Sequence, residues 1–153
     1  MVMHTVDKRQ AGVGLIEVLI AVLVLSIGFL GIAALQAKSL STSNSSMART
    51  QAVIESYSIL DAMRADRVNA QAGAYNQTVT ANNCSTLGGG LVSDQLSAWC
   101  SELGNNGLGA SATTTGQVSC STNGDCTITI TFDDSRAGLG GANNQQVITR
   151  AML

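Results

Sequence analysis

Proline is absent from the 153-residue chain, and aromatic side chains make up only 3% of it. Charged residues account for 12%, about half of the usual share, and the formal net charge is −2. This charge predicts no general attraction to nucleic acid or to anionic lipid. With so few aromatic side chains and 16 glycines, the chain can form only a modest hydrophobic core.

The usual active-site motifs are also missing. The single histidine, His4, lies near the N-terminus, and the chain has no CxxC, GxSxG or phosphate-binding glycine motif. Asp133 and Asp134 could be acid–base groups or, with Asp125 and Asn123, calcium ligands, but an acidic pair at a strand end is more often a solvated turn. We therefore predict that the protein is not an enzyme and has neither a cofactor nor a metal site.

Direct binding of nucleic acid is not predicted either. After Leu35 the chain has six basic and eight acidic residues, with no basic stripe that carries interleaved aromatic side chains. The one tryptophan, Trp99, recurs with Leu96 and Leu103 at helical spacing. This spacing predicts that Trp99 belongs to the core and does not stack on a ligand.

One long apolar segment dominates the first third of the chain. Val18–Leu35 contains no charged residue, and a helix of about 20 residues spans the hydrocarbon core of a bilayer. The basic residues Lys8 and Arg9 precede it, which favours a cytoplasmic N-terminus. Glu17 stands just before this uncharged stretch. A charged side chain within a membrane-spanning helix costs roughly 2.5–3.5 kcal/mol on insertion scales. A residue this costly needs a specific role.

The helix is predicted to continue beyond the apolar segment, because no glycine or proline occurs between Leu35 and Gly73. Apolar residues recur there at three- and four-residue steps: Val53, Tyr57, Leu60 and Met63. Charged residues such as Glu55 lie elsewhere on the helical wheel. This pattern predicts a single helix from about Leu15 to about Ala70, whose second half is amphipathic.

The C-terminal half has the pattern of a small antiparallel sheet. Apolar and Thr residues alternate strictly in CTITITF, residues 126–132, which indicates a half-buried strand. GQVSC before it and QQVITRAML after it supply two partner strands, and Asn123-Gly124 is a hairpin turn signal. The residues from Gly73 to Gly90 have the composition of a loop. Ser93 is the expected cap of a short helix that ends at Gly104.

Four cysteines, Cys84, Cys100, Cys120 and Cys126, all follow the apolar segment. An even number of cysteines in an exported domain indicates two disulfides, and the alternative is four free thiols in a cytosolic chain. Four cysteines allow three pairings. Because a hairpin would bring the strands of Cys120 and Cys126 to about 5 Å, we expect Cys120–Cys126 and Cys84–Cys100.

The stretch Gly12-Val13-Gly14-Leu15-Ile16-Glu17 resembles the cleavage motif of type IV pilins and type II secretion pseudopilins. In that family a basic leader ends in Gly, a residue that is usually Phe follows, and Glu stands four residues further on. The resemblance implies cleavage by a prepilin peptidase after Gly12 and methylation of the new amine on Val13. It also implies that Glu17 pairs with the amine of a neighbouring subunit and so sets axial register during assembly.

Further segments resemble one branch of this family, the PilV-type minor pilins. They are EVLIAVLVLSIGFLGIAALQ, ILDAMRADR, LSAWCSEL, GQVSC and CTITITFDD. The resemblance implies an α+β, pilin-like fold with a long N-terminal helix, transmembrane in its first half, packed against a small antiparallel sheet. It implies a minor pilin that takes part in type IV pilus assembly, with a minor pseudopilin of type II secretion as the alternative.

The predicted organisation is a leader peptide over 1–12, a transmembrane and assembly helix over 13–35, an amphipathic helix over 36–70 and a periplasmic sheet domain over 71–153. The protein would first cross the bacterial inner membrane once and then enter the pilus. Its expected partners are the prepilin peptidase, an inner-membrane assembly platform, and other major and minor pilins. An alternative of another class is an exported soluble binding domain whose Sec signal peptide is cleaved near Gly31–Ala33.

Overall fold

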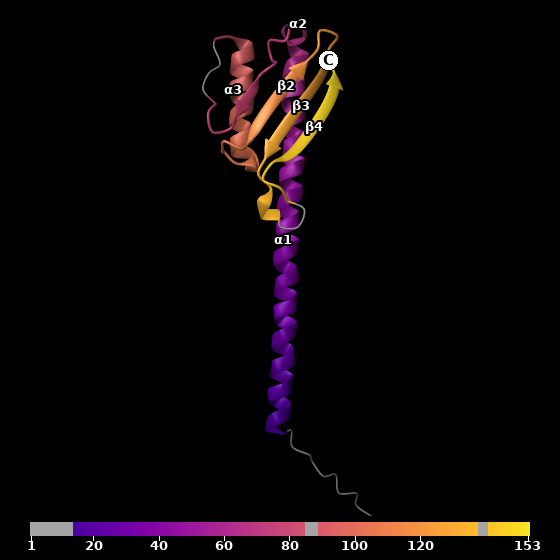
Figure 1. Ribbon diagram of the computed structural model, residues 1–153, viewed down its shortest axis with the longest axis vertical. Coiled ribbons are helices and arrows are strands. Elements are labelled where there is room, and N and C mark those ends of the chain that lie inside the picture. Colours follow the sequence, from indigo (N-terminus) through magenta and orange to yellow (C-terminus); the bar gives the residue numbers. More distant parts are fainter. Residues whose placement is uncertain (1–13, 85–88, 138–140) are drawn as a thin grey trace, which may run out of the picture. The chain divides into compact units, whose positions relative to one another are not determined.

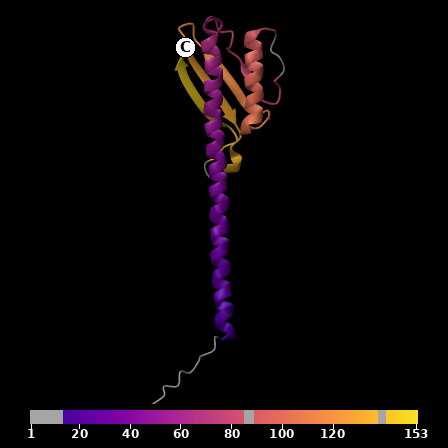
Figure 2. The same cartoon turned by 180° about the vertical axis from the view of Figure 1, so that it is seen from behind.

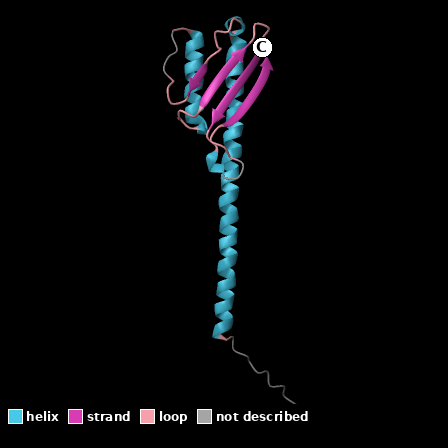
Figure 3. Ribbon diagram, viewed as in Figure 1, coloured by secondary structure: helices cyan, strands magenta, loops and turns pink. Residues whose placement is uncertain are grey.

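The computed structural model describes residues 14–84, 89–137 and 141–153, and their fold is α+β (Figures 1 and 3). A long helix packs its C-terminal part against a four-stranded antiparallel sheet, so the predicted fold class is confirmed. The chain divides into two compact units, one that ends at Ser39 and one that spans Leu40–Leu153.

The first unit consists of the N-terminal part of helix α1 (Leu15–Ala65). The carbonyl oxygen of Gly14 accepts backbone hydrogen bonds from Glu17 (2.9 Å) and Val18 (3.3 Å) and so begins the helix. The large apolar side chains from Leu15 to Leu35 are exposed. By length and composition, α1 is able to cross a membrane.

The helical backbone continues through a segment rich in Ser and Thr, residues of low helix propensity. Hydroxyl groups there donate to carbonyl oxygens one turn earlier, from Ser46 to Thr42 (3.0 Å) and from Thr50 to Ser46 (2.9 Å). These hydroxyl groups therefore have hydrogen-bond partners within the helix itself.

The single helix predicted from about Leu15 to about Ala70 is wrong, because the structure has two helices there with a break between them. Helix α1 ends at Ala65, and a short helix α2 (Arg67–Gln71) follows the non-helical Asp66, whose φ is −123° and ψ is 50°. The Asp66 carboxylate accepts hydrogen bonds from Asn69 Nδ2 at 2.8 and 2.9 Å. An Asp side chain that bonds locally competes with the helical backbone, and this accounts for the break.

The buried face of α1 also differs from the prediction. Leu60 and Met63 are fully buried as expected, but Val53 and Tyr57 are 39% and 51% exposed. The buried positions on the preceding turns are Ala52, Glu55, Ser56 and Ile59. On this face the Glu55 carbonyl oxygen accepts a hydrogen bond from Trp99 Nε1 (2.9 Å), which comes from the helix described below.

The sheet has the antiparallel order β1-β2-β3-β4. Its strands are β1 (Thr78–Thr80), β2 (Thr115–Cys120), β3 (Asp125–Phe132) and β4 (Gln145–Met152). The three predicted strands are confirmed, and Ile128, Ile130 and Phe132 are buried on one face of β3. Strand β1 lies in the stretch that the sequence predicts as loop. It is only three residues long, too short to show a periodic pattern, and its pairing with β2 defines it.

Helix α3 (Leu91–Leu103) and the part of α1 after Leu40 cover the same face of the sheet (Figure 2). The predicted inward residues of α3 are buried: Leu96, Trp99, Cys100 and Leu103. The helix is capped by Gly104 as predicted, but it begins at Leu91 after Gly90, and Ser93 is buried inside its first turn. Two short helical turns complete the fold, one at Gly104–Leu108 and one at Ser135–Ala137.

Gly116 on β2 allows the closest contact between α3 and the sheet. A Cβ at this position would lie 2.4 Å from Cη2 of Trp99 and 2.7 Å from Cδ1 of Leu103. Only a residue without a side chain lets the indole ring lie directly on the strand.

Candidate functional site

Glu17 lies in the first turn of α1, where the helix dipole favours an acidic side chain. Its sequence neighbours Leu15, Ile16 and Val18 are apolar and exposed. Between residues 14 and 35 it is the one ionisable side chain of the sequence. The helix thus presents a single carboxylate at the start of an apolar, uncovered surface, which is costly in hydrocarbon unless a cation pairs with it.

The predicted cleavage and methylation positions, Gly12 and Val13, lie outside the described residues. Their roles, and the pairing of Glu17 with an amine, stay predictions.

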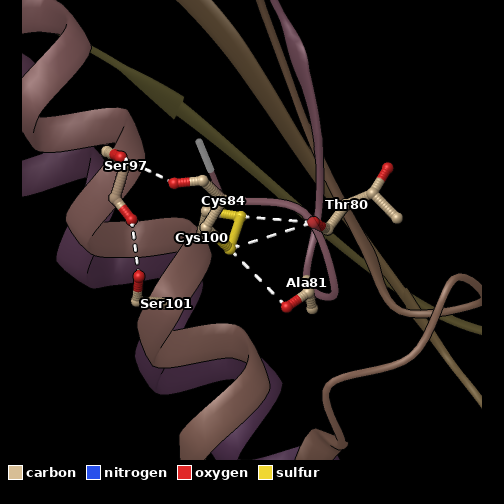
Figure 4. The surroundings of a disulfide bond; sticks show 6 residues. All are labelled: Thr80, Ala81, Cys84, Ser97, Cys100 and Ser101. Atoms are coloured by element: carbon tan, nitrogen blue, oxygen red, sulfur yellow. Dashed lines mark hydrogen bonds between the residues drawn. A yellow bond between two sulfur atoms is a disulfide. The ribbon is translucent and has the colours of Figure 1, made fainter. Parts of the chain in front are cut away.

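The four cysteines form two disulfides, Cys84–Cys100 and Cys120–Cys126, the pairing that the sequence favours. The first joins the segment after β1 to α3, with 5.5 Å between the Cα atoms (Figure 4). Ser97 of α3 donates a hydrogen bond to the Cys84 carbonyl oxygen (3.0 Å). The sulfur atoms lie 3.4–3.8 Å from the carbonyl oxygens of Thr80 and Ala81. Because disulfide sulfur carries no proton, these are packing contacts.

The second disulfide joins β2 to β3 across their hairpin, with 4.0 Å between the Cα atoms. The turn is closed by hydrogen bonds from Gly124 N to Ser121 O (3.0 Å) and from Ser121 N to Asp125 O (2.8 Å). Cys126 is buried, and Cys120 Sγ lies 3.8 Å from Sδ of Met63 on α1. This disulfide therefore belongs to the core.

The acidic residues considered as calcium ligands do not come together. Asp125 begins β3 and Asp133 and Asp134 follow its other end, eight residues away, or about 25 Å along a strand. Among residues 14–84, 89–137 and 141–153, no three His, Cys, Asp or Glu side chains are grouped as a metal site.

The interpretation of the Asp133-Asp134 pair as a solvated turn is wrong for Asp134. This carboxylate is 6% exposed, accepts a hydrogen bond from Ser45 Oγ (2.6 Å) and forms an ion pair with Arg49 (3.6 Å). It fastens the connection between β3 and β4 to α1. Asp133 is exposed, and the backbone N–H of Ser135 (2.9 Å) holds the pKa of its carboxyl below the ordinary value.

Trp99 is 2% exposed and packs in the core, as its spacing predicts. The sequence reasoning missed the buried polar residues on α1, Ser45 and Glu55, because amphipathic periodicity assigns polar side chains to solvent.

Residues 7–33 match the family model described as the prokaryotic N-terminal methylation motif. These 27 residues include Gly12, Val13 and Glu17, the positions of the predicted motif. The match supports the type IV pilin and pseudopilin superfamily, without distinguishing its branches. It implies processing by a prepilin peptidase and assembly with other pilins, and with the apolar part of α1 it indicates membrane anchoring. Neither the curated proteins nor the solved structures give a match to the chain.

Proposed function

We propose that this chain is a minor pilin, a structural subunit that takes part in type IV pilus assembly after its leader, residues 1–12, is removed. The observation that carries the proposal is the N-terminal methylation motif over residues 7–33. The uncovered apolar part of α1, most of which lies within this motif, and the disulfide-bonded unit Leu40–Leu153 agree with a membrane-anchored precursor whose C-terminal part is exported.

In this proposal Glu17 acts during assembly. Cleavage after Gly12 creates a positive amine on Val13, four residues before the carboxylate. In apolar surroundings an unpaired carboxylate is costly and a paired one much less so, so the amine of one subunit selects the Glu17 of its neighbour. The charge pair then fixes the axial register of packed helices, as polar residues do in coiled coils.

The topology follows from the same features. Residues 13–35 cross the bacterial inner membrane, with Lys8 and Arg9 of the leader on the cytoplasmic side. The amphipathic helix over 36–70 and the sheet domain over 71–153 lie in the periplasm, where the disulfides form. The partners are the prepilin peptidase, the inner-membrane assembly platform and other major and minor pilins. A PilV-type role within the pilus is the branch that the sequence resembles.

A minor pseudopilin of a type II secretion system is the second candidate, because the methylation motif is common to both systems. Deletion of the gene separates them. Loss of surface pili with normal protein secretion supports the minor pilin, whereas loss of secretion with normal piliation contradicts it.

Processing is tested by mass spectrometry of the mature N-terminus. A methylated Val13 is expected, and replacement of Gly12 by a bulky residue should leave the precursor uncut in the membrane. A mature chain that begins at Ala34 would instead show an ordinary signal peptide and end the pilin proposal.

The assembly role is tested with Glu17→Ala, and Ser26→Ala in the same segment serves as a matched control. Both variants should insert normally. Glu17→Ala removes a charge from an apolar segment, which favours insertion, and Ser26→Ala changes no charge. Only Glu17→Ala should enter sheared pili less than the wild type. Equal incorporation of the two variants would show that Glu17 merely extends to the membrane interface.

A further inference from the structure

One buried carboxylate in the unit Leu40–Leu153, called the sheet unit below, has an oxygen atom without a partner. Glu55 is 2% exposed, and its Oε1 accepts hydrogen bonds from Gln51 Nε2 and Asn106 Nδ2, both at 2.8 Å. Its Oε2 is buried and has no hydrogen-bond partner within the described part of the chain. An unsatisfied buried oxygen of this kind costs free energy, so a donor is needed there.

A second carboxyl group lies at this position, on α3. Trp99 donates to the backbone of Glu55, and one helical turn further along α3 the side chain of Glu102 is within hydrogen-bond reach of the Glu55 side chain. One turn further along α1, Ser58 Oγ lies 3.5 Å from Glu102 Oε2. Two carboxylates this close repel each other unless a proton or a cation lies between them.

We propose that Glu55 and Glu102 share one proton, which Glu102 donates to the unpartnered Oε2 of Glu55, and that this hydrogen bond strengthens the contact of α3 with α1 in mild acid. The proton comes from solvent, to which Glu102 is exposed. When it leaves, both groups are carboxylates, the hydrogen bond is lost and repulsion weakens the contact. The two helices thus form a pH-sensitive contact inside the sheet unit.

The surroundings fix the sign of the effect. Among the described residues, the charged side chain that acts on Glu102 is Glu55, while Ser58 on α1 and Asn106 after α3 are uncharged. Desolvation, and then the charge and the hydrogen bond of Glu55, raise the pKa of Glu102 above its ordinary value, against a smaller lowering by Ser58. Stability from such a group is present below its unfolded pKa and is lost as pH rises through the folded pKa.

The sharing of the proton can be observed directly, because the chain has only three glutamates, at 17, 55 and 102. The full chain in detergent micelles, with ¹³C at the glutamate carboxyl carbons, gives three resonances, and Glu102→Gln identifies one of them by its loss. We expect the Glu102 resonance to titrate above the ordinary carboxyl range and the Glu55 resonance to respond in the same window. A Glu55 resonance that stays unchanged while the Glu102 resonance titrates would overturn the proposal.

Thermal unfolding of the same preparation, followed by Trp99 fluorescence, tests the consequence. The wild-type Tm should fall from mild acid to neutral pH. Glu102→Gln, whose amide can donate at any pH, should flatten this dependence and raise the neutral Tm by about 2–4 °C. Asp94→Asn, which removes an acidic charge at the other end of α3, should keep the wild-type dependence.

Two results would overturn the proposal. One is a Glu102→Gln variant with the wild-type pH dependence. The other is a neutral Tm that excess CaCl₂ raises for the wild type but not for Glu102→Gln, since this would place a divalent cation between the carboxylates.

Discussion

At the scale of single residues, polar side chains on the buried face of α1 are the main feature that the helical pattern does not predict. Ser45 donates to Asp134, and the Ser56 hydroxyl donates to the Ala52 carbonyl oxygen (2.8 Å). Glu55 accepts two amide hydrogen bonds. Each of these side chains has at least one hydrogen-bond partner, which offsets part of the cost of its burial. Polar contacts therefore fix which face of the helix meets the rest of the unit.

The close approach at Gly116 gives one prediction. Gly116→Ala should lower the free energy of unfolding by about 1–3 kcal/mol, because its methyl group would overlap the Trp99 ring. Gly89→Ala is the matched control, since an added Cβ there meets no atom within 4 Å, and a change within about 0.5 kcal/mol is expected. Urea unfolding of the full chain in detergent, read from Trp99 fluorescence, compares the two. Equal stability of both variants would contradict the packing account.

A second prediction concerns Tyr75, which is fully buried. Its hydroxyl contacts the Asp66 carboxylate (3.1 Å) and the side-chain amide of Gln95 on α3. Desolvation by burial, followed by the hydrogen bond and charge of Asp66, raises the pKa of Tyr75 from 10.0 to about 12. A raised folded pKa means that this contribution to stability is complete below pH 10 and is lost as pH rises toward about 12.

Tyr75→Phe should therefore be less stable than the wild type at neutral pH, by about 1 kcal/mol, yet lack the loss of stability between pH 10 and about 12. Tyr57→Phe, at the half-exposed tyrosine, should keep the wild-type pH dependence. Urea midpoints measured at neutral pH and in this alkaline range provide the test. If Tyr75→Phe loses as much stability in this alkaline range as the wild type, the loss comes from other groups and the prediction is wrong.

At the scale of elements, the two disulfides fasten different kinds of structure. Cys84–Cys100 joins an irregular segment to α3 and closes a separation of 16 residues. Cys120–Cys126 closes only 6 residues in a hairpin whose strands are already paired along six residue pairs. A disulfide that closes a longer loop restricts the unfolded chain more. The first bond should thus matter more for stability.

The corresponding prediction compares two double variants. Replacing Cys84 and Cys100 by Ser should cost about 3 kcal/mol, and replacing Cys120 and Cys126 by Ser should cost about 2 kcal/mol. Urea unfolding under non-reducing conditions measures the free energy of unfolding of both variants. The fully reduced wild type gives the value for a chain with neither disulfide. A larger loss for the hairpin pair would show that packing of the sulfur atoms on Met63 outweighs chain entropy.

At the scale of the whole molecule, the two units depend on different environments. The unit Leu40–Leu153 buries its own apolar core between two helices and the sheet. In the other unit, the described residues of α1 leave their large apolar side chains uncovered. Such a surface is stable only in lipid or against other apolar helices.

Membrane anchoring by this segment is therefore the prediction at this scale. Residues 18–35 contain twelve Val, Leu, Ile or Phe residues, each favouring insertion by about 0.3–0.6 kcal/mol. Replacing Leu23, Leu25 and Ile27 by Arg adds about 2.5–3.5 kcal/mol per residue, which exceeds the sum from the remaining nine. The variant should leave the membrane pellet on carbonate extraction.

The matched control for this experiment carries the same number of arginines further along α1. The substitutions are Leu40→Arg, Met47→Arg and Ile54→Arg, at residues that are equally exposed but lie beyond the apolar segment. This variant should remain in the pellet. Extraction of both variants alike would mean that the segment 18–35 is not the anchor.

Much of the architecture could be predicted from the order of residues, because periodicity and turn chemistry are local. The alternation in residues 126–132 specified β3, Asn123-Gly124 specified its turn, and the helical spacing of Leu96, Trp99 and Leu103 specified the buried side of α3. Gly12, Val13 and Glu17 lie within one short continuous stretch of the chain, so the sequence alone pointed to them.

Only the tertiary structure decided the features that depend on contacts between distant residues. Strand β1 exists because β2 pairs with it, and Glu55 faces inward because Trp99 and Asn106 lie against it. A three-residue strand and a buried carboxylate have no periodic pattern in the sequence. Strand β2, Trp99 and Asn106 lie 35 or more positions away from these partners along the chain, and only the folded chain brings them together.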